Sequence, residues 1–281
     1  MPHQAEVKSF GSVDPVWQKV KEEAEQAVEA DKVIAGLIYN SILNHQSLEE
    51  SLAYHLSQRL DHSDVDASVL NRTFNEIINN DEAFRQTLRI DMAAVFERDP
   101  ACNRLLEPLL YFKGFHALQT HRFAHHLWLK GSIDFAFYLQ SQSSRVFGVD
   151  IHPKAKIGSG IMFDHATALV IGETAEVGDY TSILHNVTLG GSGKETGDRH
   201  PKIGTNVMIG AGSKILGNIT VGSCARVAAG SVVLEDVPKE TTVAGVPAKV
   251  IGAAGCNEPA RTMNQLLNVV TENEKNEADD G

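Results

Sequence analysis

The chain has 281 residues, of which 42% are hydrophobic, so it has enough apolar surface to bury a sizeable core. Its formal net charge of −11 at pH 7 opposes contact with nucleic-acid phosphates. The three cysteines lack CxxC spacing, no window is apolar enough for a membrane span, and the N-terminus lacks a signal-peptide pattern. We therefore expect a cytoplasmic protein with reduced thiols.

The first half of the chain predicts amphipathic helices. Apolar residues recur at helical spacing over residues 33–42, 48–60 and 74–78. Ser47 lies three residues before Glu50, which is the pattern of a capping box, and Asp81 is a second candidate N-cap. The Asp99-Pro100 pair predicts a helix end. Together these signals indicate an α-helical N-terminal oligomerisation domain over residues 1–145.

A six-residue repeat begins at Ile151. It reads IHPKAK, IGSGIM and FDHATA, and it resumes after two extra residues as IGETAE, VGDYTS and ILHNVT. An aliphatic residue at the first position of each hexad can point inward if three hexads form one triangular coil of a parallel β-solenoid. Glycine and small residues would serve the corners, where positive φ or close packing is required. A β-sandwich would need period-two alternation instead.

The repeat defines the rest of the chain. We assign residues 146–252 to the solenoid, and the spacing does not give its handedness. Residues 253–281 are expected to form a flexible tail, because they end in a charged stretch without apolar anchors. The repeat is interrupted between Gly190 and Lys202 by a Gly-rich segment, which predicts a loop that leaves the solenoid at a corner. Its residues Arg199 and His200 favour a functional loop over an inert one.

His165 lies at the third position of its hexad, outside the aliphatic ladder, so its side chain is expected to point outward. Asp150 lies fifteen residues earlier, near one coil length, where its carboxylate would orient the imidazole. Such a pair can act as a general base, since histidine ordinarily titrates near pH ~6.5. Spacing alone favours an ordinary surface histidine beside an aspartate.

Several strings resemble bacterial and plant serine O-acetyltransferases. They include ERDPAC, LLYFKGFHALQTHR, VDIHPKAKIG, MFDHATALVIGETAEVG and GDRHPKIG, within residues 84–252. The resemblance implies an α+β chain with an α-helical N-terminal domain and a left-handed parallel β-helix acyltransferase domain of hexapeptide repeats. It also implies trimers that pair into hexamers. The implied reaction is acetyl transfer from acetyl-CoA to the L-serine hydroxyl, giving O-acetyl-L-serine for cysteine biosynthesis.

The resemblance also implies roles for individual residues. His165 would be the catalytic general base and Asp150 its orienting partner. Asp99 and Asp164 would hold the serine ammonium, Arg199 would pair with the serine carboxylate, and His200 would line the pocket. Acetyl-CoA would be a co-substrate, with no permanently bound cofactor and no metal. The residues expected to line its path are Gly191, Ser192, Ala211, Ala229 and Lys249.

The implied partners are the substrates, further copies of the chain, and L-cysteine as a feedback inhibitor. Family members also bind O-acetylserine sulfhydrylase through a C-terminal isoleucine, whereas this sequence ends in Gly281. Two other functions stay open at this point. A β-helical carbonic anhydrase would use histidines such as His152, His165, His185 and His200, but their spacing lacks the expected His-x4-His pair. A related transferase would acetylate a sugar.

Overall fold

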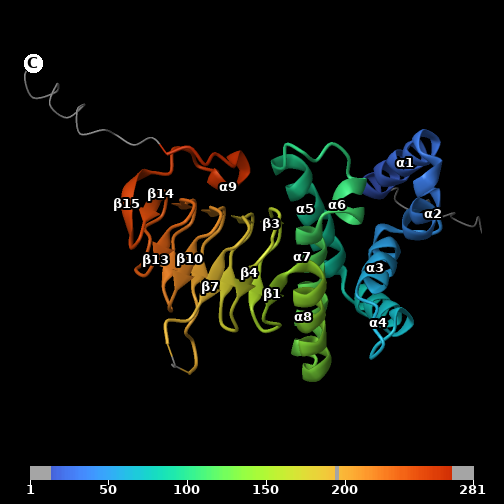
Figure 1. Ribbon diagram of the computed structural model, residues 1–281, viewed down its shortest axis with the longest axis horizontal. Coiled ribbons are helices and arrows are strands. Elements are labelled where there is room, and N and C mark those ends of the chain that lie inside the picture. Colours follow the sequence, from blue (N-terminus) through green and yellow to red (C-terminus); the bar gives the residue numbers. More distant parts are fainter. Residues whose placement is uncertain (1–13, 194–195, 268–281) are drawn as a thin grey trace, which may run out of the picture.

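The computed structural model describes residues 14–193 and 196–267. It consists of a helical part followed by a solenoid of parallel strands, and the two are packed end to end (Figure 1). In the described ranges, no helix is long and apolar enough to cross a membrane.

The helical part contains eight α-helices and two short turns of other helix types. The α-helices are α1 Pro15–Ala30, α2 Ala35–Ile38, α3 Leu48–Arg59, α4 Ala67–Asn80, α5 Glu82–Arg98, α6 Leu106–Leu110, α7 Lys113–Leu129 and α8 Ile133–Phe147. The 3-10 turn η1 spans Lys32–Ile34 and the π turn η2 spans Tyr39–Leu43. The predicted helix boundaries are confirmed: Ser47 Oγ accepts from the Glu50 N–H at 3.2 Å, Asp81 caps α5, and α5 ends at the residue before Asp99.

The solenoid has fourteen parallel strands and one antiparallel closing strand. These are β1 Val149–Ile151, β2 Lys156–Ile157, β3 Met162–Phe163, β4 Leu169–Ile171, β5 Glu176–Val177, β6 Ser182–Ile183, β7 Thr188–Gly190, β8 Lys202–Ile203, β9 Met208–Ile209, β10 Lys214–Leu216, β11 Thr220–Val221, β12 Arg226–Val227, β13 Val232–Val233, β14 Thr241–Gly245 and β15 Ala248–Ala253. They form a five-stranded sheet (β1-β4-β7-β10-β13), a four-stranded sheet (β11-β8-β5-β2) and a six-stranded sheet (β15-β14-β12-β9-β6-β3).

The predicted aliphatic ladder forms the core of the solenoid. In the five-stranded sheet, successive coils are in register at Ile151, Ile171, Leu189, Ile215 and Val233. All five side chains are buried. Each coil therefore adds one aliphatic residue per sheet to a continuous apolar column, and its backbone hydrogen bonds are completed by the coils on either side.

The glycines of the repeat have the two expected roles, close packing and positive φ. The hexad glycines are needed for space: a Cβ on Gly178, Gly204 or Gly210 would lie within 2.6 Å of the backbone of the next coil. Positive φ occurs at the corner glycines Gly160, Gly212 and Gly230, and also at corner residues that are not glycine, such as Tyr180 and Cys224. The expectation that only glycine and small residues serve the corners was therefore wrong at Tyr180, where a bulky residue takes the left-handed conformation.

One buried carboxylate joins the helical part to the solenoid. Asp91 of α5 is fully buried and accepts from Arg122 of α7, with Nε at 2.7 Å. The same carboxylate accepts from the backbone N–H groups of Gly160 and Ile161, at 2.9 and 3.2 Å. Arg122 also donates to the Gly158 carbonyl at 2.7 Å. Helices α5 and α7 are thereby fixed against the first coil.

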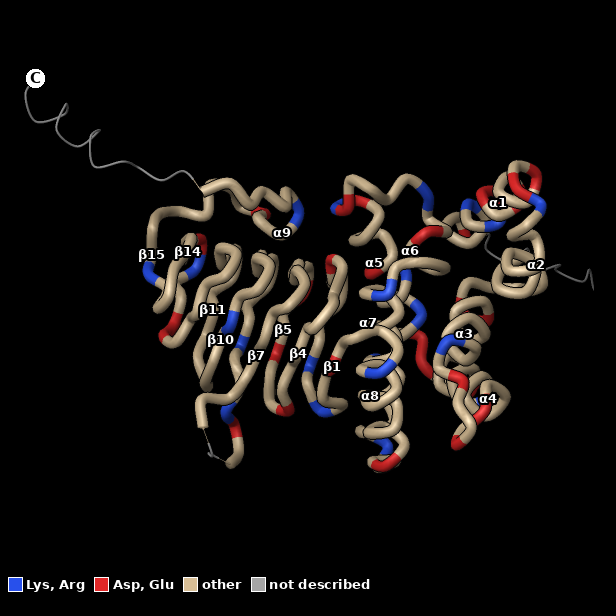
Figure 2. Tube along the Cα trace, in the orientation of Figure 1, with Lys and Arg blue, Asp and Glu red and all other residues tan. Residues whose placement is uncertain are grey.

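The corner loop and the segment after the last strand bear on the expected boundaries. The loop expected between Gly190 and Lys202 lies between β7 and β8, carries charges of both signs and projects from the solenoid (Figures 1 and 2). Residues 254–267, expected to belong to a flexible tail, instead fold back over the six-stranded sheet and include the short helix α9 Pro259–Thr262. We call residues 254–267 the strap. The rest of the expected tail, 268–281, lies outside the described residues.

The close stacking of coils predicts opposite effects for the same substitution at two glycines. Gly210→Ala should lower the free energy of unfolding by about 1–3 kcal/mol, because the new Cβ would meet the Ala229 backbone N at 2.5 Å. Gly36→Ala in α2 should raise it by up to about 1 kcal/mol, because nothing lies within 4 Å and alanine favours a helix. Urea unfolding at matched protein concentration measures both, and an unchanged Gly210→Ala midpoint would contradict close stacking.

Candidate active site

Three predicted site residues meet at one edge of the solenoid. Asp99, Asp164 and His165 line a pocket of about 490 Å³ between the end of α5, the start of α7 and the end of β3. We call the corner between the six-stranded and five-stranded sheets, which includes residues 164–168, 184–187, 210–213 and 228–231, the His165 edge.

Local sequence explains how this pocket forms. Asp99 takes an extended conformation before Pro100 and ends α5, and its Oδ1 accepts from the Ala101 N–H at 2.8 Å. Helix α7 then approaches β3 very closely at Gly114, where a Cβ would lie 2.1 Å from the Phe163 carbonyl oxygen. Glycine therefore lets α7 form one wall of the pocket immediately beside Asp164.

His165 is presented to solvent at the mouth of the pocket. Its backbone is left-handed, with φ 54°, and its side chain is 76% exposed. The imidazole Nε2 lies 3.8 Å from Asp164 Oδ1, and the ring of His185 in the next coil lies 5.9 Å away, centroid to centroid. The imidazole is therefore accessible to a substrate that enters the pocket.

The electrostatics of the pocket favour a cation. Burial raises the pKa of the Asp164 carboxyl above its ordinary value. The neighbouring His165 opposes this rise, and the charge of Asp99 adds to it. Two carboxylates that disfavour each other's charge would both be stabilised by a positive group placed between them.

The remaining predicted substrate residues lie at a different corner. We call the corner between the five-stranded and four-stranded sheets, which includes residues 152–155, 172–175, 191–193 and 196–201, the Arg199 edge. Arg199 Nη1 lies 2.9 Å from Glu173 Oε2, and Lys154 Nζ lies 2.9 Å from the other oxygen of the same carboxylate. Hydrogen bonds from Lys154 and Arg199 lower the pKa of Glu173.

Thr174 organises the Arg199 edge. Its hydroxyl accepts from the backbone N–H groups of Arg199 and His200, at 3.0 and 3.1 Å. The Thr174 N–H points at His200 Nδ1 at 3.2 Å, so Nδ1 is an acceptor and a neutral His200 carries its proton on Nε2. Burial lowers the pKa of His200, which keeps it neutral. Gly172 provides the space, because a Cβ there would lie 2.1 Å from the imidazole.

Asp150 does not contact His165 within one chain. Its register partner in the next coil is Val170, five residues after His165, and its Oδ1 accepts from Gln140 Nε2 at 2.6 Å. In the described part of the chain, no hydrogen bond or ion pair joins Asp150 to His165. The strand that carries Asp150 leads directly into the Arg199 edge, where its charge acts on His152.

The residues expected to line the acetyl-CoA path also divide between the edges. Ala211 and Ala229 lie on the His165 edge, where backbone hydrogen bonds link Gly212 to His185 and Gly230 to Ala211. Gly191 and Ser192 lie at the Arg199 edge, next to the Arg199 and Gly217 backbone respectively. Lys249 is on β15 and lies 3.5 Å from Glu235.

Sequence reasoning missed several residues of both edges. Lys113 and Thr167 line the pocket and contact each other across its mouth. Lys113 and Gly114 belong to the string LLYFKGFHALQTHR, so the signal was present without a stated role. Thr174 belongs to the string MFDHATALVIGETAEVG, again without a stated role, because its importance arises from contacts with residues 25 and 26 positions away. Across residues 14–193 and 196–267, no group of three His, Cys, Asp or Glu side chains is placed to hold a metal ion.

Two family models match the chain. The model described as "Serine acetyltransferase, N-terminal" matches residues 16–120, which begin in α1 and end within α7. The model described as "Bacterial transferase hexapeptide (six repeats)" matches residues 200–235, within the later coils. The serine acetyltransferase of Salmonella typhimurium is 48% identical over 253 residues, which is 90% of this chain and 93% of that protein.

Solved structures agree with this assignment. The Brucella abortus serine acetyltransferase in complex with coenzyme A is 55% identical, with a TM-score of 0.85 over 87% of this chain and 98% of that one. The Neisseria gonorrhoeae enzyme in complex with serine is 49% identical, with a TM-score of 0.82 over 85% of this chain and 98% of that one. A further serine acetyltransferase, in complex with cysteine, is 47% identical with a TM-score of 0.88, over 90% and 98%.

The expected fold class, an α-helical N-terminal domain followed by a left-handed parallel β-helix of hexapeptide repeats, is confirmed by these matches. The matches extend over both parts of the molecule and over nearly the whole length of each relative. This chain therefore belongs to the serine acetyltransferase family.

Proposed function

We propose that this chain transfers acetyl from acetyl-CoA to the hydroxyl of L-serine, giving O-acetyl-L-serine and CoA, with His165 as the general base. The observation that carries the residue assignment is the pocket of about 490 Å³ in which an exposed imidazole lies beside two carboxylates. The pocket suits a small zwitterion better than a sugar, because a sugar offers no positive group to Asp99 and Asp164.

The chemistry follows from the position of the imidazole. A serine hydroxyl is a weak nucleophile near neutral pH, so His165 takes its proton as the oxygen attacks the thioester carbonyl. The tetrahedral intermediate then collapses, the C–S bond breaks, and the imidazolium returns the proton to the CoA thiolate. One histidine thus serves both proton transfers, and the acetyl group ends on the serine oxygen.

The carboxylates position the nucleophile. An ammonium placed between Asp99 and Asp164 would offset the burial and like-charge repulsion that raise the pKa of Asp164. The serine carboxylate needs a cation on the opposite side, and Arg199 and the Nε2–H of His200 have the right chemistry. These groups lie on the other edge of the same chain.

We infer that two copies of the chain complete each site, with the His165 edge of one facing the Arg199 edge of the next. A trimer satisfies this arrangement with three equivalent, head-to-tail interfaces. Asp150 lies on β1, the strand that leads into the Arg199 edge. In this arrangement, Asp150 of one copy would orient His165 of the other. The outward face of the five-stranded sheet lies between the two edges and exposes 39% of Val170.

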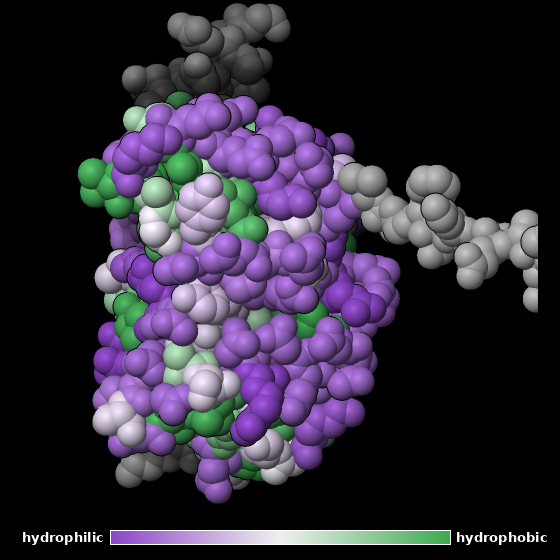
Figure 3. Space-filling model, turned by 90° about the vertical axis from the view of Figure 1, so that its right-hand side faces the viewer, coloured by the Kyte–Doolittle hydropathy of each residue, from purple (hydrophilic) through white to green (hydrophobic). Residues whose placement is uncertain are grey.

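Pairing of trimers into hexamers would use the helical end. The space-filling view of that end shows separate hydrophobic patches among hydrophilic residues (Figure 3). The exposed apolar side chains of η1, α2 and η2 include Val33, Leu37 and Tyr39, with Val33 92% exposed. Apolar residues this exposed support a contact between copies.

Acetyl-CoA would lie along the His165 edge. Ala229 is three coils from His165, or roughly 14 Å at the spacing of neighbouring strands. The small side chains of Ala211 and Ala229 leave room for an extended pantetheine arm, and Gly191 and Ser192 would close over it from the second copy. Lys249, near the outer end of this path, would meet a phosphate.

L-cysteine would compete with serine, because it presents the same ammonium and carboxylate with a thiol in place of the hydroxyl. The pathway that uses this product makes cysteine, so binding there would act as feedback inhibition. We place the reaction in the cytoplasm, where acetyl-CoA is available. Binding of O-acetylserine sulfhydrylase would involve the C-terminus, which lies outside the described residues.

Removing the imidazole should abolish most of the activity. We expect His165→Ala to lower kcat by at least about 10²-fold, the lower range for a general base, with little change in thermal stability because the side chain is exposed. Release of CoA thiol from acetyl-CoA and L-serine measures turnover. His185→Ala, on the same edge one coil away, is the matched control and should lose less than about 10-fold. Parental turnover in His165→Ala would refute the assigned role.

Removing one charge from the ammonium site should weaken serine binding selectively. Asp99→Asn should raise KM for L-serine by about 10- to 100-fold, which corresponds to one hydrogen bond to a charged group. The KM for acetyl-CoA should stay within about twofold, because the acetyl-CoA path lies along other coils. Steady-state kinetics with each substrate varied in turn measures both constants. An equal rise in the two KM values would count against a serine-specific role.

A further inference from the structure

We propose that Arg98 is a positioning residue that fixes the serine-binding carboxylate of Asp99 relative to Asp164 and His165. The inference rests on the proposed role of Asp99. Arg98 is the last residue of α5, so its backbone is joined directly to Asp99. Its side chain points the other way, into the junction between the helical part and the six-stranded sheet.

The contacts of Arg98 are unusual for a buried cation. Only 6% of the residue is exposed, and Nη1 donates to Ser182 Oγ at 3.1 Å and to the Tyr180 carbonyl at 3.3 Å. Nε is buried without a partner, and no carboxylate of residues 14–193 and 196–267 forms an ion pair with the guanidinium. Burial lowers the pKa of Arg98. Burying a cation among neutral acceptors costs stability, so stability alone does not explain this residue.

The register of the strands shows what the contact achieves. Ser182 of β6 is the register partner of Met162 in β3, and β3 leads into Asp164 and His165 two and three residues later. The Arg98 side chain therefore links the end of α5, next to Asp99, to β6, and β6 pairs with β3, the strand that leads into Asp164. The relative position of the two carboxylates follows from this short chain of contacts.

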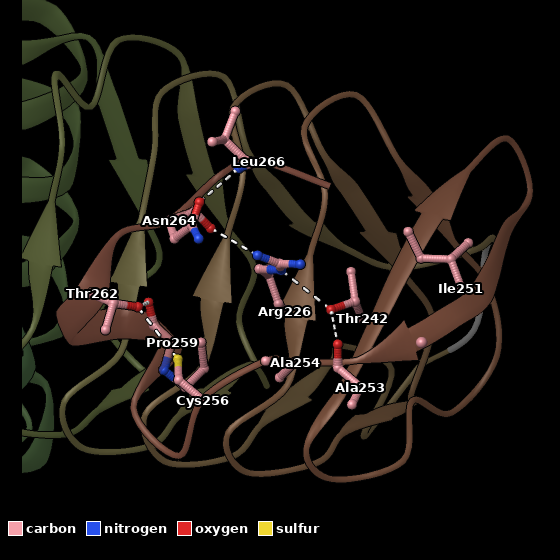
Figure 4. A pocket seen from close by; sticks show the side chains of 12 residues that line it. Arg226, Thr242, Ile251, Ala253, Ala254, Cys256, Pro259, Thr262, Asn264 and Leu266 are labelled. Atoms are coloured by element: carbon pink, nitrogen blue, oxygen red, sulfur yellow. Dashed lines mark hydrogen bonds between the residues drawn. The ribbon is translucent and has the colours of Figure 1, made fainter. Parts of the chain in front are cut away.

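The strap closes the same junction from outside. Ser182 Oγ accepts from Arg98 and donates to the Ala260 carbonyl of α9 at 2.9 Å, so the hydroxyl is fixed in direction. Arg261 lies 3.7 Å from Glu97, the residue before Arg98, and α9 lies beside the end of α5 (Figure 1). At its far end the strap is held by Arg226, whose Nη1 donates to the Asn264 carbonyl at 3.1 Å (Figure 4).

The expected consequence is specific for one substrate. If the end of α5 shifts by about 1 Å, the ammonium site loses its geometry, and misplacement of this size can reduce catalysis up to about 10²-fold. The acetyl-CoA path along the His165 edge does not involve α5. Loss of the Arg98 contact should therefore raise KM for L-serine and leave KM for acetyl-CoA unchanged.

The experiment compares Arg98→Gln, Arg98→Lys and Ser182→Ala with the parent enzyme by steady-state kinetics and thermal unfolding. We expect Arg98→Gln to raise KM for L-serine about 10-fold, Arg98→Lys to recover part of that loss, and Ser182→Ala to give a smaller rise. The Arg98→Gln and Ser182→Ala effects should not add in the double variant, because both break one contact. Ser182→Ala removes only a hydroxyl, so it keeps the test informative if Arg98→Gln fails to fold.

Arg85→Gln is the control, because it removes an arginine near the other end of α5 that pairs with Glu82, and it should leave both KM values unchanged. The inference is overturned if Arg98 and Ser182 variants lower the unfolding temperature while KM for L-serine stays at the parental value. Asp99→Asn is measured alongside. If Asp99→Asn also leaves KM for L-serine unchanged, the proposed role of Asp99 fails; if it alone raises that KM, only the role of Arg98 fails.

Discussion

The stacking of one coil on the next is the constraint on which the rest of this structure depends. Backbone hydrogen bonds between coils hold equivalent residues in register. At Gly178, Gly204 and Gly210 the next coil lies so close that no side chain would fit between the layers. A residue at a corner therefore has a fixed position along the solenoid axis. This rigidity gives an exposed imidazole a defined position without burying it, and it makes the proposed acetyl-CoA path along the same edge straight.

The same constraint separates groups that the proposed mechanism requires together. Within one chain, the carboxylates and imidazole of the His165 edge and the guanidinium of the Arg199 edge lie on opposite sides of the five-stranded sheet. The sheet cannot bend to join them, so the proposed site requires a second copy of the chain. In the proposed assembly, each chain contributes two different half-sites. The helical part supplies the end of α5 that carries Asp99, and it is fixed to the first coil through Asp91 and to the second coil through Arg98.

The sequence predicted the features that repeat and missed those that depend on distant contacts. The hexad period located the aliphatic ladder, the corner loop and the outward His165, and capping patterns located Ser47 and Asp81. Periodicity measures distance along a coil, however, and it could not show that Asp150 is in register with Val170 instead of lying beside His165. No repeat predicted the strap, because it is bound to the sheet by single contacts such as the hydrogen bond from Ser182 to Ala260.

The most direct measurement of a site shared between chains is complementation. Chains carrying His165→Ala and chains carrying Arg199→Ala are mixed during assembly, and thiol release with acetyl-CoA and L-serine is compared with each variant alone. We expect about a quarter of the parental activity at equal mixing, because one interface in four pairs two intact edges. Mixing His165→Ala with Asp99→Asn, whose changes lie on the same edge, should restore nothing. Failure of the first mixture to exceed its separate components would contradict the account.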